Sequence, residues 1–180
     1  NTALARGGHN PPPAPEPDNL MNVVTVSPMN GDYTNPVEAL NDIPDTNVDP
    51  YLIIIGPGVY EVTSAIHMKE GVTIQGAGQE STKITGAISS SFPNESSAIV
   101  KGASNSALTD LTIINRGGGG TYSIAIFNSL ASPRIERVTA IAMGESGYAN
   151  TGVLNENYSS PIMTNVTASA SSEGGTIENF

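Results

Sequence analysis

The sequence predicts an all-β protein built as a single-stranded, right-handed parallel β-helix, and three observations indicate this fold. A short apolar motif recurs about every 27–28 residues. Apolar and polar positions alternate inside each copy, which is the period of a β-strand and not of a helix. Charged residues make up only 13% of the chain, which is instead rich in glycine, serine and asparagine, the residues of turns.

The chain divides into two parts. Residues 1–21 are expected to form a Pro-rich extended arm or linker, because closely spaced prolines favour the polyproline II conformation. These prolines are Pro11, Pro12, Pro13, Pro15 and Pro17. Residues 22–180 are expected to form the β-helix as one domain, with a short helix near its N-terminal end acting as a cap.

The elements before the repeat follow from local signals. Residues 22–27 are expected to form a strand, because they include three valines. A helix is predicted over residues 36–42, because Asn35 is a suitable N-cap, Pro36 suits the first helical position and Pro44 ends the helix. Two strands follow over residues 51–55 and 59–62, and the turn between them is Gly-Pro-Gly.

Three segments of the repeat align without gaps: LTDLT (108–112), IERVT (135–139) and MTNVT (163–167). A coil of this length holds about three short strands, and stacked coils place matching residues roughly 4.8 Å apart. One inward ladder is predicted from Val72, Leu111, Val138 and Val166. An outward ladder is predicted from Thr73, Thr112, Thr139 and Thr167. A second inward ladder is predicted from Ile74, Ile113, Ala140 and Ala168.

Each copy carries a second alternating strand. Residues 123–128 are expected to stack on residues 151–156, and residues 176–179 begin a further copy before the chain ends at Phe180. The C-terminal end of the solenoid is therefore expected to be open.

Three phrases near the N-terminus resemble the pectin-lyase-like right-handed β-helix superfamily: GDYTNPVEAL (31–40), YLIIIGPGVY (51–60) and GVTIQGAG (71–78). The first two are similar to the capping helix and first strand of pectinesterases. The later coils resemble secreted bacterial β-helix proteins of unassigned function. The resemblance covers roughly residues 22–180 and implies the fold far more specifically than it implies an activity.

The catalytic phrases that the resemblance would imply are not found. The sequence contains no QAVAL, DFIFG or GRPW phrase of a pectinesterase and no Gly-His-Gly of a polygalacturonase. Asp110 is the only aspartate after Asp49, so the carboxylate cluster of a pectate lyase cannot form in these coils. We therefore expect no catalytic, cofactor-binding or metal-ligating residue, and no cofactor.

Individual charged residues support the same interpretation. Arg134, Arg137, Glu136 and Arg116 could bind a sugar acid, but solvated charges with weak ion pairs are the preferred interpretation. Asp110, Arg137 and Asn165 occupy matching positions of successive coils and are expected to form a surface ladder with one ion pair. His67 has no partner histidine and is expected to be a turn or edge residue.

Composition limits the partners. The net charge of −10 argues against nucleic acid, and no apolar run reaches the ~20 residues that membrane insertion requires. The chain contains no cysteine and starts without methionine, as a mature secreted or cell-surface protein would.

The function predicted from these observations is that of a non-catalytic extracellular structural or adhesive protein. Its open end and N-terminal arm would allow self-association head to tail into a filament, and carbohydrate is a second expected partner. The alternative is a polysaccharide-active enzyme or carbohydrate-binding module of the pectin lyase or pectinesterase kind, whose catalytic coils are missing from this chain.

Overall fold

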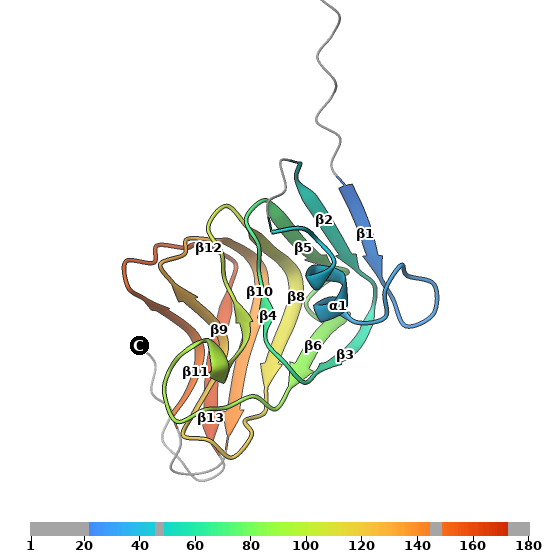
Figure 1. The fold of residues 1–180 in the computed structure, drawn as a ribbon. Helices are drawn as coiled ribbons and strands as arrows, with labels where there is room; N and C mark the ends of the chain where they lie inside the picture. Colours follow the sequence, from blue (N-terminus) through green and yellow to red (C-terminus); the bar gives the residue numbers. More distant parts are fainter. Residues whose placement is uncertain (1–21, 46–48, 145–148, 173–180) are drawn as a thin grey trace, which may run out of the picture.

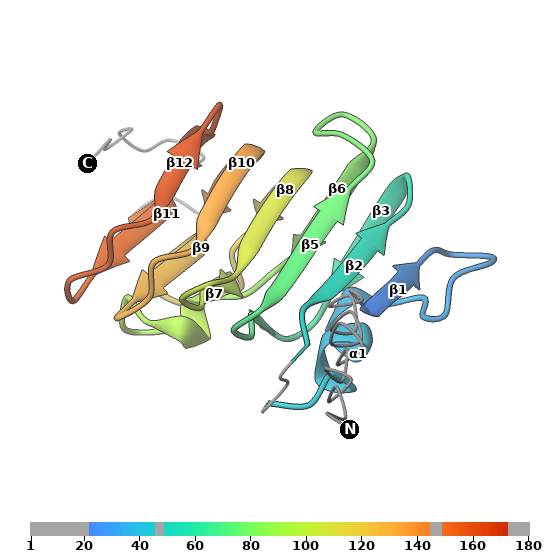
Figure 2. The same ribbon diagram turned by 90° about the horizontal axis from the view of Figure 1, so that it is seen from above.

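The computed structural model describes residues 22–45, 49–144 and 149–172. The predicted Pro-rich arm and the partial repeat at residues 176–179 lie outside these ranges. The described chain winds as a solenoid of parallel strands, seen edge-on as a row of nearly parallel arrows in Figure 2.

The larger sheet forms one long side of the solenoid (Figures 1 and 2). Its main row runs in the order β1 (Asn22–Val26), β2 (Tyr51–Ile55), β5 (Val72–Gly76), β8 (Ala107–Asn115), β10 (Arg134–Gly144) and β12 (Ile162–Thr164). The same sheet continues through β3 (Gly58–Val62), β6 (Thr82–Gly86), the C-terminal halves of β8 and β10, and β13 (Thr167–Ser172).

The smaller sheet has the order β11 (Ala149–Glu156), β9 (Tyr122–Ser129), β7 (Ala98–Lys101) and β4 (Ile66–His67). Aliphatic side chains from both sheets fill the interior between them, including the fully buried Ile74, Leu111, Ile113 and Ile126. Burial of one such side chain stabilises the fold by about 1.5–3 kcal/mol, so the stacked interior is the main source of stability.

Helix α1 spans Pro36–Asn41, close to the predicted residues 36–42. The Asn35 side chain accepts a hydrogen bond from the Val37 N–H at 2.8 Å, and Pro36 takes the first helical position as expected. Ala39 and Leu40 are buried in the core cluster, so the helix packs against the interior at the end where β1 and β2 lie (Figure 1).

The register of the later coils confirms most of the predicted ladders. Leu111 pairs with Val138, and both are completely buried. Two further rows are paired as predicted, Thr112–Thr139–Thr167 and Ile113–Ala140–Ala168. The threonine row faces outward but is partly covered, because the Thr112 hydroxyl donates to the Gln79 carbonyl at 2.7 Å and the Gln79 amide donates to the Thr139 hydroxyl at 3.0 Å.

The predicted place of the first copy is wrong. Val72, Thr73 and Ile74 do not stack on Leu111, Thr112 and Ile113, because β5 pairs with the N-terminal half of β8, with Thr73 opposite Ala107 and Ile74 opposite Leu108. Residues 77–81 separate β5 from β6 as a loop. The following strand, β6, therefore supplies the partner of Ile113, which is Ile84.

The predicted alignment of the second strand is wrong by one residue. Thr151 pairs with Ile124 and not with Ser123, and Asn155 pairs with Asn128. A side-chain hydrogen bond from Asn128 to Asn155 at 2.8 Å accompanies this register. A slip of one residue would turn each side chain to the opposite face of its strand, so the two asparagines could not meet in the predicted alignment.

Candidate ligand-binding site

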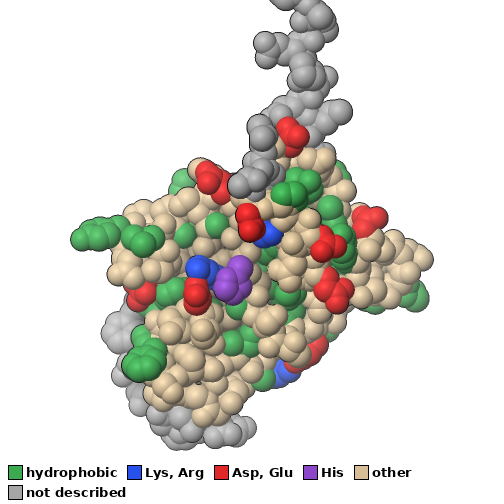
Figure 3. Space-filling model, in the orientation of Figure 1, with side chains coloured by type: hydrophobic (Ala, Val, Ile, Leu, Met, Phe, Trp, Pro, Cys, Tyr) green, Lys and Arg blue, Asp and Glu red, His purple; other side chains and the backbone are tan. Residues whose placement is uncertain are grey.

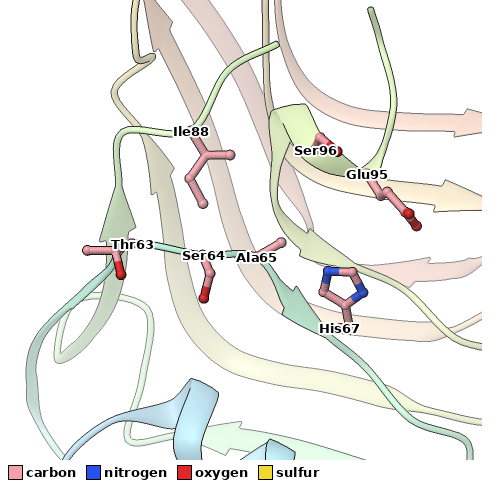
Figure 4. Close-up of a pocket in the computed structure, with 7 residues that line it drawn as sticks. All are labelled: Thr63, Ser64, Ala65, His67, Ile88, Glu95 and Ser96. Atoms are coloured by element: carbon pink, nitrogen blue, oxygen red, sulfur yellow. The ribbon is translucent and has the colours of Figure 1, made fainter.

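A pocket of about 280 Å³ opens beside β4, the edge strand of the smaller sheet (Figure 4). One wall comes from residues 63–67 and the other from residues 88–96, a segment between β6 and β7. The lining residues are Thr63, Ser64, Ala65, His67, Ile88, Glu95 and Ser96. Two segments of the chain that are far apart in the sequence therefore build this pocket together.

Strand β4 places His67 on the outer face of the solenoid. Ile66 points inward and is buried, so the next side chain, His67, faces outward and is exposed. In the parallel pairing of β4 with β7, His67 lies opposite Lys101. Figure 3 shows the imidazole (purple) on this face beside a basic and an acidic side chain.

Residues 94–97 hold the second wall through a capping box. The Asn94 side chain accepts from the Ser96 N–H at 3.0 Å, and the Ser97 hydroxyl accepts from the Asn94 N–H at 3.1 Å at the start of the 3-10 helix η1 (Glu95–Ser97). Earlier in the same segment, Ser90 and Tyr122 exchange two backbone hydrogen bonds, at 3.2 and 2.9 Å. Glu95 and Ser96 are thereby fixed beside His67.

Asn115 ties this wall to the regular coils from inside. Its amide donates to the carbonyls of Ile88, Ser97 and Ile124 at 2.8, 3.0 and 2.8 Å. Its side-chain oxygen accepts from the N–H groups of Ile88 and Gly117, both at 3.1 Å. Asn115 is completely buried, so its hydrogen bonds satisfy backbone groups of residues 88–97 that water does not reach.

Glu95 forms an ion pair with Lys101 at the edge of the pocket. The hydrogen bond from Lys101 and the charge of Lys101 lower the pKa of Glu95, and the charge of His67 lowers it further by a smaller amount. The side chains of Lys101 and Glu95 are 36% and 46% exposed, so the pair fixes geometry more than it stabilises the fold. The carboxylate consequently stays ionised at neutral pH.

The pocket combines three hydroxyl groups, an imidazole and a carboxylate with two apolar residues, Ala65 and Ile88. Such a mixture matches a ligand that carries many hydroxyl groups on an apolar ring skeleton. No group of three or more His, Asp and Glu side chains suited to a metal ion occurs in the described part of the chain.

The arginines considered in the sequence all form ion pairs. Arg137 contacts Asp110 through two hydrogen bonds at 2.5 and 2.8 Å, and Arg134 pairs with Glu136 at 2.7 Å. Arg116 lies apart from these residues and pairs with Glu61. The predicted surface charges with ion pairs are thus confirmed.

The predicted ladder of Asp110, Arg137 and Asn165 also occurs and has an unexpected backbone conformation. All three residues adopt positive φ, at 58°, 50° and 54°. Each turns the strand at the same corner of successive coils, and the ion pair bridges the first two corners. The hydrogen bond from Arg137 is the largest cause of the lowered pKa of Asp110, because it favours the charged carboxylate.

His67 lies on an edge strand, as predicted, but its neighbours could not be predicted from the sequence. Lys101 follows His67 by 34 residues and not by one repeat, because residues 87–97 are inserted between the strands. The sole local signal was the Asn94–Ser97 spacing, which is typical of a capped turn. The repeat alone therefore could not have found this pocket.

No protein-family model and no curated protein sequence matches this chain. Solved structures do match: a pectin methylesterase in complex with a hexasaccharide gives a TM-score of 0.56 at 14% identity, over 71% of this chain and 49% of that chain. Pectin methylesterase PemA from Erwinia chrysanthemi gives 0.53 at 14% identity, over 69% of this chain and 47% of that chain.

This chain is a right-handed parallel β-helix with the pectin-lyase-like fold, as the sequence predicted. It spans about half the length of the pectin methylesterase structures that it matches. No helix in the described ranges has the length and apolar character that crossing a membrane requires.

Proposed function

We propose that this chain is a non-catalytic, extracellular β-helix that binds carbohydrate in the pocket beside His67. The pocket carries the proposal, because it brings hydroxyl, imidazole and carboxylate groups together with two apolar residues, Ala65 and Ile88, on the side of a solenoid. One of the matched pectin methylesterase structures holds a hexasaccharide, so a protein with this fold accommodates a carbohydrate chain. The proposal takes from this matched structure the class of ligand, a carbohydrate, and not the reaction of the pectin methylesterase.

The non-catalytic part of the proposal is supported by the state of the charged groups. The one carboxylate of the pocket, Glu95, is paired with Lys101, and its lowered pKa disfavours the protonated form that a general acid needs. The arginines and acids of the later coils bind each other at the corners. These residues are structural partners in our account.

Calorimetric titration with hexasaccharides tests the proposal. The panel contains galacturonate, glucose, mannose and xylose hexamers, and at least one should bind the pocket. His67→Ala should weaken that binding about tenfold or more, while Gln75→Ala, an exposed residue of the larger sheet, should leave it unchanged. Both substitutions are on the surface, so each should change the free energy of unfolding by no more than about 0.5 kcal/mol.

Product analysis in the same samples separates binding from catalysis. The proposal predicts that each hexasaccharide is recovered intact. Cleaved or de-esterified product that depends on His67 would contradict it and favour the alternative, a polysaccharide-active enzyme.

Head-to-tail assembly into a filament stays a prediction. At the β1 edge the Thr25 N–H donates to the Asp32 carboxylate at 2.9 Å and the Tyr33 N–H donates to the Thr25 carbonyl at 3.0 Å. A stacked neighbour would have to displace this turn to pair fully with β1. Light scattering over a range of concentrations tests the prediction, and a constant monomer mass would contradict it.

A further inference from the structure

A second surface lies where the smaller sheet turns back into the larger one. Three successive turns, residues 102–106, 130–133 and 157–161, stack beside one another here and are called the turn ridge below. Two bulky side chains project from it: Leu130 is 76% exposed and Tyr158 is 99% exposed. Burial therefore does not explain either residue.

Backbone preference does not explain them either. Leu130 and Tyr158 have φ values of 53° and 65°, in the left-handed region that glycine and asparagine tolerate and bulky side chains disfavour. Asparagines stand at the comparable conformations of neighbouring positions, Asn105 at 54° and Asn157 at 51°. A strained backbone beneath an exposed apolar side chain indicates a role outside the folded chain itself.

Serine hydroxyls repeat along the turn ridge at the spacing of the coils. The Ser132 N–H donates to the Ser104 hydroxyl at 3.2 Å, and the Ser160 N–H donates to the Ser132 hydroxyl at 3.0 Å. The Ser104 and Ser132 hydroxyls thus act as acceptors within the fold and each has its own proton left to donate. All three serines are exposed, so the ridge presents donors at about the 4.8 Å spacing of paired strands.

A groove of about 400 Å³ adjoins these serines, lined in part by Asn105, Ser132, Pro133, Arg134 and Ile162. Three carboxylates lie beside the groove and the ridge. The Asn105 amide donates to Glu70 at 2.6 Å, the Asn157 amide donates to Glu156 at 3.1 Å, and Glu136 is paired with the Arg134 guanidinium at 2.7 Å. These carboxylates repel an anionic polymer, so the surface favours a neutral one.

We propose that the turn ridge binds a neutral, linear polysaccharide lying along the stacking direction of the coils. Tyr158 and Leu130 would pack against the apolar faces of sugar rings, and the serine hydroxyls would bond sugar hydroxyls. A linear polymer matches the repeated donors, whereas a folded protein partner would not require them to be repeated. This ridge is separate from the pocket beside His67 and does not depend on it.

Leu130→Asn and Tyr158→Asn give the sharpest test. Asparagine tolerates left-handed φ, so each variant should melt at the same temperature as the parent protein or higher. Each should also weaken binding of a neutral β-1,4-linked hexasaccharide of glucose, mannose or xylose at least tenfold. Met29→Asn is the matched control, because Met29 is an exposed apolar residue of a different turn, and it should leave binding unchanged.

The two binding proposals fail separately. Binding that survives His67→Ala and is lost in Tyr158→Asn supports the turn ridge. Binding that is lost in His67→Ala and survives Tyr158→Asn overturns the ridge and leaves the pocket. Absence of binding by all three neutral hexasaccharides overturns the ridge, as does a dimer in light scattering that Tyr158→Asn abolishes, because the ridge would then be a self-association surface.

Discussion

The coil that contains β5 and β6 turns its corner differently from the coils that contain β8 and β10. It uses a loop, residues 77–81, and carries a second insertion at residues 87–97. The later coils turn at one left-handed residue, Asp110 or Arg137, and keep their strands continuous. The regular coils build the interior, and the irregular coil supplies one wall of the pocket. In this molecule the candidate site lies where the repeat is interrupted.

The largest effect is expected where the irregular coil is tied to the regular ones. Asn115→Ala removes five hydrogen bonds, among them those to the buried carbonyls of Ser97 and Ile124 and to the half-buried backbone groups of Ile88. Each unsatisfied buried group costs about 1–3 kcal/mol, so we expect a loss of about 3 kcal/mol or more in the free energy of unfolding. Urea denaturation measures it.

Asn41→Ala, at an exposed position of α1, serves as the control and should change stability by no more than about 0.5 kcal/mol. A loss below about 1 kcal/mol for Asn115→Ala would show that residues 87–97 do not depend on this anchor.

A smaller effect is expected at the corner where the two kinds of coil meet. A Cβ on Gly76 would lie 2.4 Å from the Asp110 carbonyl oxygen, so Gly76→Ala must shift the backbone of β8. We expect a loss of about 2 kcal/mol, within the range of over-packed sites. Thermal unfolding measures it.

The comparison for Gly76→Ala is Gly119→Ala. A Cβ at Gly119 meets no atom within 4 Å, but its φ of 84° is left-handed, so we expect about 1 kcal/mol from conformation alone. Equal losses of stability for the two variants would mean that Gly76 and Asp110 do not approach each other this closely in solution.

The smallest effect is expected at the regular corner. Arg137→Asn removes the exposed ion pair with Asp110 but replaces a disfavoured left-handed residue with a tolerated one. We expect stability at neutral pH to change by no more than about 0.5 kcal/mol. A loss above about 2 kcal/mol would show that the ion pair dominates the corner.

The pH dependence sharpens the same prediction. Asp110 has a pKa below its ordinary value of 3.8, so its ion pair contributes stability above that value and loses it as the pH falls through the lower pKa of the folded state. In Arg137→Asn the pKa of Asp110 should rise toward 3.8, as measured by NMR titration.

Much of the regular region could be predicted from the sequence, because matching residues recur at a nearly constant period. The pairing of Leu111 with Val138 and the bridge between Asp110 and Arg137 followed directly. The place of Val72 could not be predicted, because the loop at residues 77–81 splits the strand in this coil and changes the number of residues between paired positions. The predicted alignment at Thr151 was wrong because paired residues of β9 and β11 are 27 positions apart, whereas those of β10 and β12 are 28 apart, so the extra residue enters after β11.

The pocket was beyond prediction for a physical reason. Glu95 reaches Lys101 and His67 only because residues 87–97 fold back, held by Asn115 and by the Ser90–Tyr122 pairing. Asn115 and Tyr122 are separated from that segment by a strand or more, and no periodicity relates them to it. Long-range hydrogen bonds, not local propensity, place this wall.

Hydrogen–deuterium exchange with and without the bound hexasaccharide tests the central claim most directly. We predict added protection in residues 63–67 and 88–96, on both walls of the pocket, with β8 and β10 unchanged. Protection confined to the backbone amides of β8 and β10 near their ion pairs, with none at residues 63–67 or 88–96, would place the ligand on the regular coils. That result would contradict the proposed binding site.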